Sequence, residues 1–123
     1  MTLSPASAQA LVARQAEGWG NADPDQIVAD FATDCQFIAP GQHLLGRSQV
    51  YQAATEFFAA NNRVEITVQR VISQANAVAV EWQWHETNLQ TGQQQRADDA
   101  IIIQLNSQQQ IVYWREYIDR RSA

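Results

Sequence analysis

The sequence predicts one α+β domain that spans residues 1–123. Before Arg63, apolar residues recur at helical spacing, whereas after it they alternate with polar residues as in β-strands. Helices followed by a long run of strands are typical of α+β proteins and not of repeated βαβ units. With 46% apolar and 17% charged residues, the chain can bury one hydrophobic core.

The first helix is expected to begin at Ser4 and Pro5, because serine caps helices well and proline fits the first helical position. Gly18 and Gly20 are expected to end this helix. Its buried side is formed by residues at helical spacing, namely Ala8, Leu11, Val12, Gln15, Ala16 and Trp19.

Asp23 and Pro24 repeat the same starting signal and predict a short second helix. The buried side of this helix is expected to contain Ile27, Val28 and Phe31. The run 35–39 is bounded by Asp34 and Pro40, which favours a short strand over another turn of helix.

A loop through His43 is expected to lead into a third helix that stops at Asn61 and Asn62. The apolar stripe of this helix consists of Val50, Tyr51, Ala54, Phe57 and Phe58. Four long strands then fit the alternating pattern, over residues 64–73, 77–88, 93–105 and 110–119. Their connections are short enough to be hairpins, so an antiparallel meander is expected.

The choice of basic residues excludes several chemistries. All eight of them are arginines, so the chain has no lysine for Schiff-base catalysis or for a Walker-type phosphate loop. The arginines are spread through a chain with a net charge of −5 and form no basic stripe, which binding to duplex nucleic acid requires. We therefore expect no nucleic-acid partner.

Cys35 is the only cysteine, so no disulfide can form within the chain and a reducing, cytoplasmic setting is expected. Its apolar surroundings indicate a small buried side chain and not a nucleophile. The two histidines and Cys35 lack metal-ligand spacing, so we expect no metal and no cofactor. No signal-peptide pattern and no apolar run of membrane-spanning length is present, and no membrane partner is expected.

Three motifs carry a family resemblance: WGNADPD at 19–25, FATDCQF at 31–37 and WREYID at 114–119. Their order and spacing resemble the nuclear-transport-factor-2-like superfamily, particularly its SnoaL-like and limonene-epoxide-hydrolase-like members. The resemblance implies a cone in which a curved mixed or antiparallel sheet wraps around three N-terminal helices. It also implies an apolar pocket in the open end and a homodimer through the outer face of the sheet.

Strand alternation predicts which side chains face this pocket. On the second long strand, the more apolar face is assigned inward and consists of Val78, Val80, Trp82, Trp84 and Glu86. The corresponding faces of the third and fourth long strands consist of Asp99, Ile101, Ile103 and Leu105, and of Val112, Trp114, Glu116 and Ile118. Tryptophans and carboxylates would thus converge on one hollow.

Glu116 is the first catalytic candidate, because it lies where the epoxide-hydrolase-like proteins place an acidic catalytic residue in a related run. Among indole rings its carboxylate would lose hydration, which raises the pKa and allows proton exchange near neutrality. The alternative is a buried acid neutralised by an arginine or a tyrosine hydroxyl. Asp99 is the second candidate, with a solvated pair of Asp98 and Asp99 as its alternative. If Asp99 and Glu116 lie within a few ångströms, they share one proton.

The catalytic sets of two relatives do not carry over onto this sequence. The Arg-x-Asp positions of the epoxide-hydrolase-like proteins fall on Trp82 and Trp84, so an Asp-Arg-Asp relay is disfavoured. The two essential carboxyl positions of ketosteroid isomerase fall on Ala39 and Ile101, so that mechanism is excluded as far as the alignment holds. The function must therefore be argued from the site itself.

The candidate ligand contacts are mostly aromatic or aliphatic residues expected around the hollow. Four indoles in a small core leave N–H donors that need partners, which suits a lined cavity better than a dry interior. His43 is interpreted either as a polar ligand contact at the pocket mouth or as an exposed loop residue. The full set is Trp19, Phe37, His43, Tyr51, Trp82, Trp84, Ile101, Ile103 and Trp114.

Three functions stay open at this point. The first is a SnoaL-like enzyme of isomerase, cyclase or hydrolase type that performs acid/base chemistry on a small apolar molecule. The second is a non-catalytic module that binds such a molecule. The third is a homodimeric assembly domain that uses the outer-face residues Tyr113, Arg115 and Tyr117.

Overall fold

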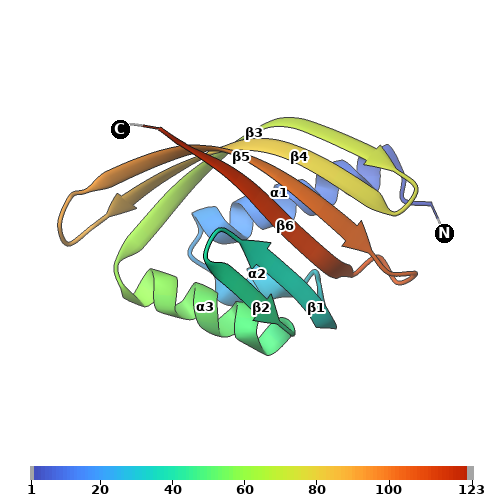
Figure 1. Cartoon of the computed structure of the whole chain (residues 1–123), viewed down its shortest axis with the longest axis horizontal. Helices are drawn as coiled ribbons and strands as arrows, with labels where there is room; N and C mark the ends of the chain where they lie inside the picture. The colour runs from blue at the N-terminus through green and yellow to red at the C-terminus, as the bar shows by residue number, and fades with distance from the viewer. Residues whose placement is uncertain (1, 122–123) are drawn as a thin grey trace.

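The computed structural model describes residues 2–121, which form three helices and one six-stranded sheet (Figure 1). The helices are α1 (Pro5–Gly20), α2 (Pro24–Val28) and α3 (Arg47–Ala59). The strands are β1 (Phe31–Ala39), β2 (Gln42–Leu45), β3 (Asn62–Gln74), β4 (Ala77–Asn88), β5 (Gln94–Leu105) and β6 (Ile111–Arg121). Within residues 2–121, no helix is long and apolar enough to cross a membrane.

The sheet is mixed and strongly curved. Its strand order is β2-β1-β6-β5-β4-β3, and all neighbours are antiparallel except β1 and β6, which run parallel. The long strands β3 to β6 arch over α1, and α3 lies with β1 and β2 in the lower part of the view (Figure 1). This arrangement confirms the predicted α+β fold with a curved sheet around N-terminal helices.

The predicted helix starts are confirmed by their caps. The Ser7 backbone N–H donates to the Ser4 side chain at 3.1 Å, and the Gln26 backbone N–H donates to Asp23 Oδ1 at 3.2 Å. Both bonds satisfy amides that have no partner within their own helix.

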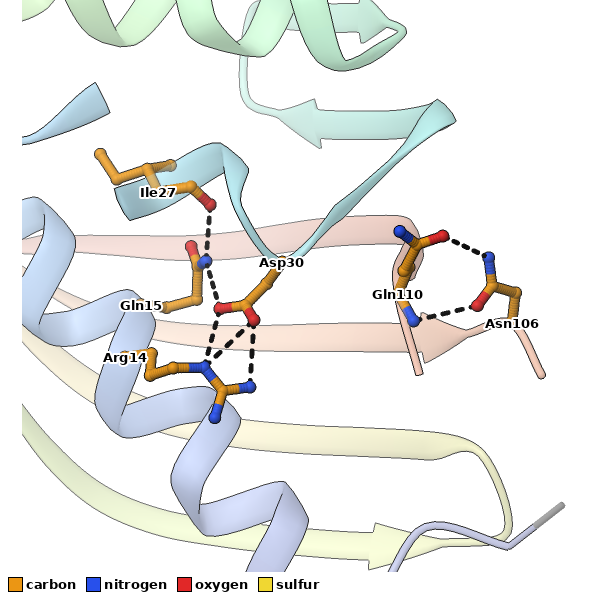
Figure 2. A network of polar contacts seen from close by, with 6 residues as sticks. All are labelled: Arg14, Gln15, Ile27, Asp30, Asn106 and Gln110. Atoms are coloured by element: carbon orange, nitrogen blue, oxygen red, sulfur yellow. Dashed lines mark hydrogen bonds and ion pairs between the residues drawn. The ribbon is translucent and has the colours of Figure 1, made fainter. Parts of the chain in front are cut away.

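A polar network holds α1 to the segment that enters the sheet. The buried side chain of Gln15 donates through Nε2 to the Ile27 carbonyl at 2.8 Å and to Asp30 Oδ2 at 3.3 Å (Figure 2). Arg14 forms an ion pair with the same Asp30 carboxylate at 3.0 Å. The Ile111 backbone N–H donates to the Asp30 carbonyl at 2.8 Å, which links this turn to β6.

Two of the secondary-structure assignments predicted for the N-terminal half of the chain were wrong. Phe31 was expected in the second helix, but it opens β1, because its backbone pairs with Ile111 of the parallel neighbour β6. The expected loop through His43 is instead strand β2, which forms a hairpin with β1. The turn contains Gly41 at φ +77°, a conformation that glycine adopts without strain.

The predicted alternation on the last strand holds only beyond a local irregularity. Leu105 pairs with Ile111 and Gln104 pairs with Tyr113, so Val112 is the extra residue of a register shift. As a result Ile111 is fully buried in place of Val112, which was expected to face inward. From Trp114 onward the strand regains the predicted orientation.

The hydrophobic core lies between α1, α3 and the concave face of the sheet. Trp114 stacks on Phe37 with ring centroids 5.6 Å apart and contacts Trp82 at 5.9 Å. Cys35 is buried in this core, as predicted, and burial raises the pKa of its thiol. The aromatic rings of Phe37, Trp82 and Trp114 lie directly beneath the candidate site.

Candidate functional site

A cavity of about 210 Å³ lies between the helices and the concave face of the sheet. Its helix side is apolar and includes Trp19 of α1 and Phe57 of α3. The sheet side brings the charged residues that line it, which are Glu86, Asp99, Glu116 and Arg120. An apolar wall that faces a few convergent polar groups is the usual composition of a small-molecule site.

Strand pairing explains why two of the carboxyl groups meet. Asp99 lies between Trp82 and Ile118 on the neighbouring strands, and Glu116 lies directly opposite Ile101. Asp99 and Glu116 are therefore diagonal neighbours on the same face of β5 and β6, and such pairs are within reach of long side chains. The Asp99 and Glu116 carboxyl groups are close enough for each to shift the pKa of the other.

The Asp99 carboxyl is held by a buried donor. Only 5% of Asp99 is exposed, and the Trp82 indole N–H donates to its Oδ2 at 3.1 Å. Among residues 2–121, no N–H or hydroxyl group donates to Oδ1. A protonated Glu116 carboxyl is therefore the group that can satisfy the remaining oxygen.

The pKa values of the two acids are displaced by their surroundings. Burial raises the pKa of Glu116 well above its ordinary value, and the hydrogen bond to Asp99 and the negative charge of Asp99 raise it further. Burial also raises the pKa of Asp99, but hydrogen bonds from Glu116 and Trp82 oppose this effect. The nearby Trp114 indole opposes the rise in the Glu116 pKa. Its N–H has no hydrogen-bond partner of good geometry among residues 2–121. The Trp82 N–H on Asp99 favours Asp99 as the ionised partner and Glu116 as the carrier of a shared proton.

The open end of the cavity combines aromatic rings with two charged side chains. The Trp84 indole N–H donates to Glu86 Oε1 at 3.0 Å, and the Trp84 ring contacts Trp19 at 5.5 Å. Arg120 lines the same end from β6 and donates to Gln95 Oε1 at 3.3 Å. Arg120 was missed because the last strand was expected to stop at Asp119, although the alternation 114, 116, 118, 120 continues to it.

The predicted site residues fall into three groups. Trp19, Phe37 and Trp84 line the cavity with Asp99 and Glu116. The second group is buried behind the cavity wall, in the core, and consists of Trp82, Ile101, Ile103 and Trp114. The third group, His43 and Tyr51, lies outside the cavity.

The positions of His43 and Tyr51 have local causes. In β2 the residues Gln42 and Leu44 face the cavity, so His43 between them is exposed and approaches Gln36 Oε1 at 3.4 Å. Tyr51 is 40% exposed, because it follows the inward-facing Val50 on α3 and points away from the hollow. The structure therefore does not bring these two candidates to the site.

No group of three or more metal-ligating side chains gathers within residues 2–121. The cavity instead presents an acid pair, a third carboxylate and one guanidinium within an aromatic frame. These groups can exchange protons and hold polar atoms of an organic molecule.

The curved sheet and the cavity with its charged groups together make this a small pocket-bearing protein of the α+β class. The chain belongs to the SnoaL-like domain family, whose model matches residues 12–114. No protein of curated function matches the chain in sequence.

Solved structures show the same fold at low sequence identity. An LEH-like epoxide hydrolase from M. tuberculosis is 17% identical with a TM-score of 0.79, over 91% of this chain and 82% of that one. A SnoaL-like protein of unknown function from Burkholderia thailandensis is 15% identical with a TM-score of 0.79, over 97% and 99% of the two chains. A candidate SnoaL-like polyketide cyclase from Jannaschia Sp. CCS1 is 19% identical with a TM-score of 0.78, over 97% and 91%.

Proposed function

We propose that this SnoaL-like protein is an enzyme that performs acid/base chemistry on a small apolar molecule. The observation that carries the proposal is the placement of Asp99 and Glu116 as diagonal neighbours on one face of β5 and β6, where both line a mostly apolar cavity. Two acids whose pKa values are pushed apart supply a proton donor and a proton acceptor at the same pH.

The roles of the two acids follow from the order in which they ionise. Between the two pKa values the pair holds one proton, with Glu116 as general acid and Asp99 as general base. Asp99 accepts a proton from the bound molecule, and Glu116 donates its proton to a developing oxyanion. The apolar wall with Trp19 and Phe57 limits the access of water and strengthens these interactions.

Isomerase, cyclase and hydrolase reactions all use such proton transfers. The names of the structural neighbours include a polyketide cyclase and an epoxide hydrolase, and both support a reaction of this general type. Trp82 and Trp84 occupy the Arg-x-Asp positions expected for an epoxide-hydrolase relay, so the proposal does not include that relay.

A generic proton-transfer substrate tests the proposal without knowledge of the natural one. 5-Nitrobenzisoxazole loses a carbon-bound proton to a base, its N–O bond breaks, and a coloured cyanonitrophenolate forms. We expect the protein to accelerate this reaction over the same concentration of acetate, because the base is desolvated and positioned. Asp99→Asn and Glu116→Gln should each lower the rate by about 10²-fold or more.

Asp98→Asn is the matched control, since Asp98 is adjacent to Asp99 but binds Arg121 on the opposite face of the sheet. This variant should keep the wild-type rate. A wild-type rate no faster than acetate, or equal rates in the Asp98 and Asp99 variants, contradicts the proposal.

The second candidate function is a non-catalytic binding module. The aromatic cluster of Trp19, Phe57 and Trp84 favours it, because such a frame binds an apolar ligand without any chemistry. Saturable quenching of tryptophan fluorescence by 5-nitrobenzisoxazole, with no product formed, is the result that distinguishes this function from catalysis.

We also propose that two copies associate through the outer face of the sheet. Ile72, Ile102 and Tyr117 are 56%, 40% and 53% exposed there, and the Arg115 guanidinium lies 5.1 Å from the centre of the Tyr117 ring. Exposed aliphatic and aromatic side chains with arginine are typical of interfaces.

We also propose a cytoplasmic location, because the buried, unpaired Cys35 fits a reducing compartment.

A further inference from the structure

Arg120 belongs to a row of three side chains that runs across neighbouring strands and lines the cavity. Trp84 of β4, Ala97 of β5 and Arg120 of β6 are successive partners across the sheet, and all three line the cavity. Ala97 is the small residue between an indole ring and a guanidinium. The row therefore leaves room above Ala97 for a ligand group that contacts Trp84 on one side and Arg120 on the other.

The charge of Arg120 is not neutralised by a neighbouring acid. Within residues 2–121, no carboxylate lies at ion-pair distance from Arg120, and its hydrogen bond at 3.3 Å goes to the neutral Gln95 side chain. By contrast, the adjacent Arg121 is paired with Asp98 on the opposite face. Arg120 is also the only cationic side chain among the described residues that line the cavity.

Glu86, the other charged side chain at this end, is engaged elsewhere. It accepts the Trp84 indole N–H at 3.0 Å and lies on β4, two strands away from Arg120. A negative ligand group is therefore favoured on the β6 side of the opening and disfavoured on the β4 side.

We propose that Arg120 binds a carboxylate of the substrate, so that the enzyme acts on a small apolar monocarboxylate whose charged end lies at the opening. A guanidinium offers two parallel N–H donors that match the two oxygens of a carboxylate. This inference rests on the proposed function, since it assigns the substrate class of the same cavity.

The distance along β5 between Ala97 and Asp99 places the apolar part of such a substrate beside Asp99 and Glu116. Asp99 lies two residues along β5 from Ala97, a distance of about 6.6–6.8 Å between their Cα atoms. A molecule whose carboxylate lies on Arg120 thus directs the carbon atoms a few bonds away toward Asp99 and Glu116. Arg120 is a positioning residue in this arrangement and does not itself move a proton.

A binding experiment with matched probes tests the assignment. Phenylpropanoate and phenylpropanol have the same apolar part and differ in the charged end, and calorimetry measures the dissociation constant of each. We expect the wild-type protein to bind the carboxylate at least about tenfold more tightly than the alcohol, the scale of one charge-assisted contact. The preference should weaken with added salt, because Arg120 is exposed.

Arg120→Gln should remove the preference for the carboxylate while binding of the alcohol is unchanged. Arg96→Gln is the control, because it changes the net charge equally but Arg96 lies on the outer face, opposite Arg121. Arg120→Lys should retain part of the preference, because it keeps the charge and loses the planar fork.

The outcomes separate this inference from the proposed function. Equal affinities of the two probes for the wild-type protein, or equal losses in the Arg96 and Arg120 variants, overturn the Arg120 assignment and leave the cavity intact. If neither probe binds, the assignment is overturned together with ligand binding in the cavity. Loss of 5-nitrobenzisoxazole turnover in Asp99→Asn tests the role of Asp99 and Glu116 and does not test the role of Arg120.

Discussion

The proton on Glu116 is the residue-level feature on which the chemistry depends. We propose that Glu116 carries it, because burial raises the pKa of this carboxyl and because the nearby Asp99 is stabilised as an anion. The Trp82 N–H supplies that stabilisation from the neighbouring strand at 3.1 Å. The two acids are thus unequal because only one of them has a fixed N–H donor of good geometry.

The raised pKa of Glu116 predicts how the stability of the fold depends on pH. The folded state holds this proton above the ordinary pKa of 4.5, so it binds more protons than the unfolded state there. The contribution of Glu116 to stability is therefore fully present below that pH and is lost as the pH rises through the folded-state pKa. Glu116→Gln keeps the shape and removes the titration, so we expect the variant to melt a few degrees above the wild type at pH 9.

Thermal unfolding of both proteins at pH 5 and pH 9 measures this difference. The variant should show the smaller fall in melting temperature, and Asp98→Asn should behave as the wild type. Parallel falls in wild type and Glu116→Gln would show that Glu116 carries no raised pKa.

Side-chain orientation could be predicted from the sequence wherever a long strand alternates regularly. The inward positions of Trp84, Asp99 and Glu116 follow from alternation alone, and the structure has them there. The pairing of Asp99 with Glu116 depends on the register between two strands, which the sequence does not encode locally. Arg120 was missed because the strand was predicted to end at Asp119, two residues before its observed end at Arg121.

At the scale of elements, the contact between α1 and α2 depends on the absence of a side chain at Gly18. A Cβ atom there would lie 3.1 Å from Ile27 Cγ1 and 3.2 Å from the Ile27 backbone nitrogen. This close approach, and not the end of a helix, is the reason for the glycine.

Gly18→Ala should therefore destabilise the protein by about 1–2 kcal/mol, because overpacking against the Ile27 backbone outweighs the gain in helix propensity. Gly20→Ala is the comparison, since its Cβ would meet only the Val64 carbonyl oxygen at 3.9 Å. Urea unfolding measures both variants. A Gly18→Ala protein as stable as the wild type would rule out the tight contact.

Element boundaries were predictable where a local signal exists. The caps at Ser4 and Asp23 depend on side chains next to the helices they start, and both are present. Strand β2 has four residues and gives no recognisable alternation, so only its pairing with β1 reveals it. That omission also explains why His43 was placed at the cavity.

At the scale of the whole molecule, the parallel pairing of β1 with β6 completes the hollow. It places Phe37 opposite Trp114 and brings the β1–β2 hairpin beside Glu116. The two strands are separated by most of the sequence, and no local pattern predicts their contact. The resemblance of three motifs to a known family predicted the cone where residue patterns alone gave only the fold class.

The proposed homodimer is a prediction at this scale. Light scattering should give twice the mass of one chain for the wild type, and Ile102→Glu should give a monomer, because it places a charge on the outer face. Leu89→Glu is the matched control, since Leu89 is 62% exposed in the loop after β4. A wild-type monomer at micromolar concentration contradicts the dimer.

The central claim is that Asp99 and Glu116 share one proton, and carbon-13 NMR of the labelled carboxyl groups tests it most directly. We predict that Asp99 ionises first and that Glu116 ionises at a pH well above its ordinary value, with each group sensing the titration of the other. In Asp99→Asn the Glu116 pKa should fall, because the neighbouring negative charge is gone. Independent titrations near the ordinary values of 3.8 for Asp99 and 4.5 for Glu116 would contradict the account.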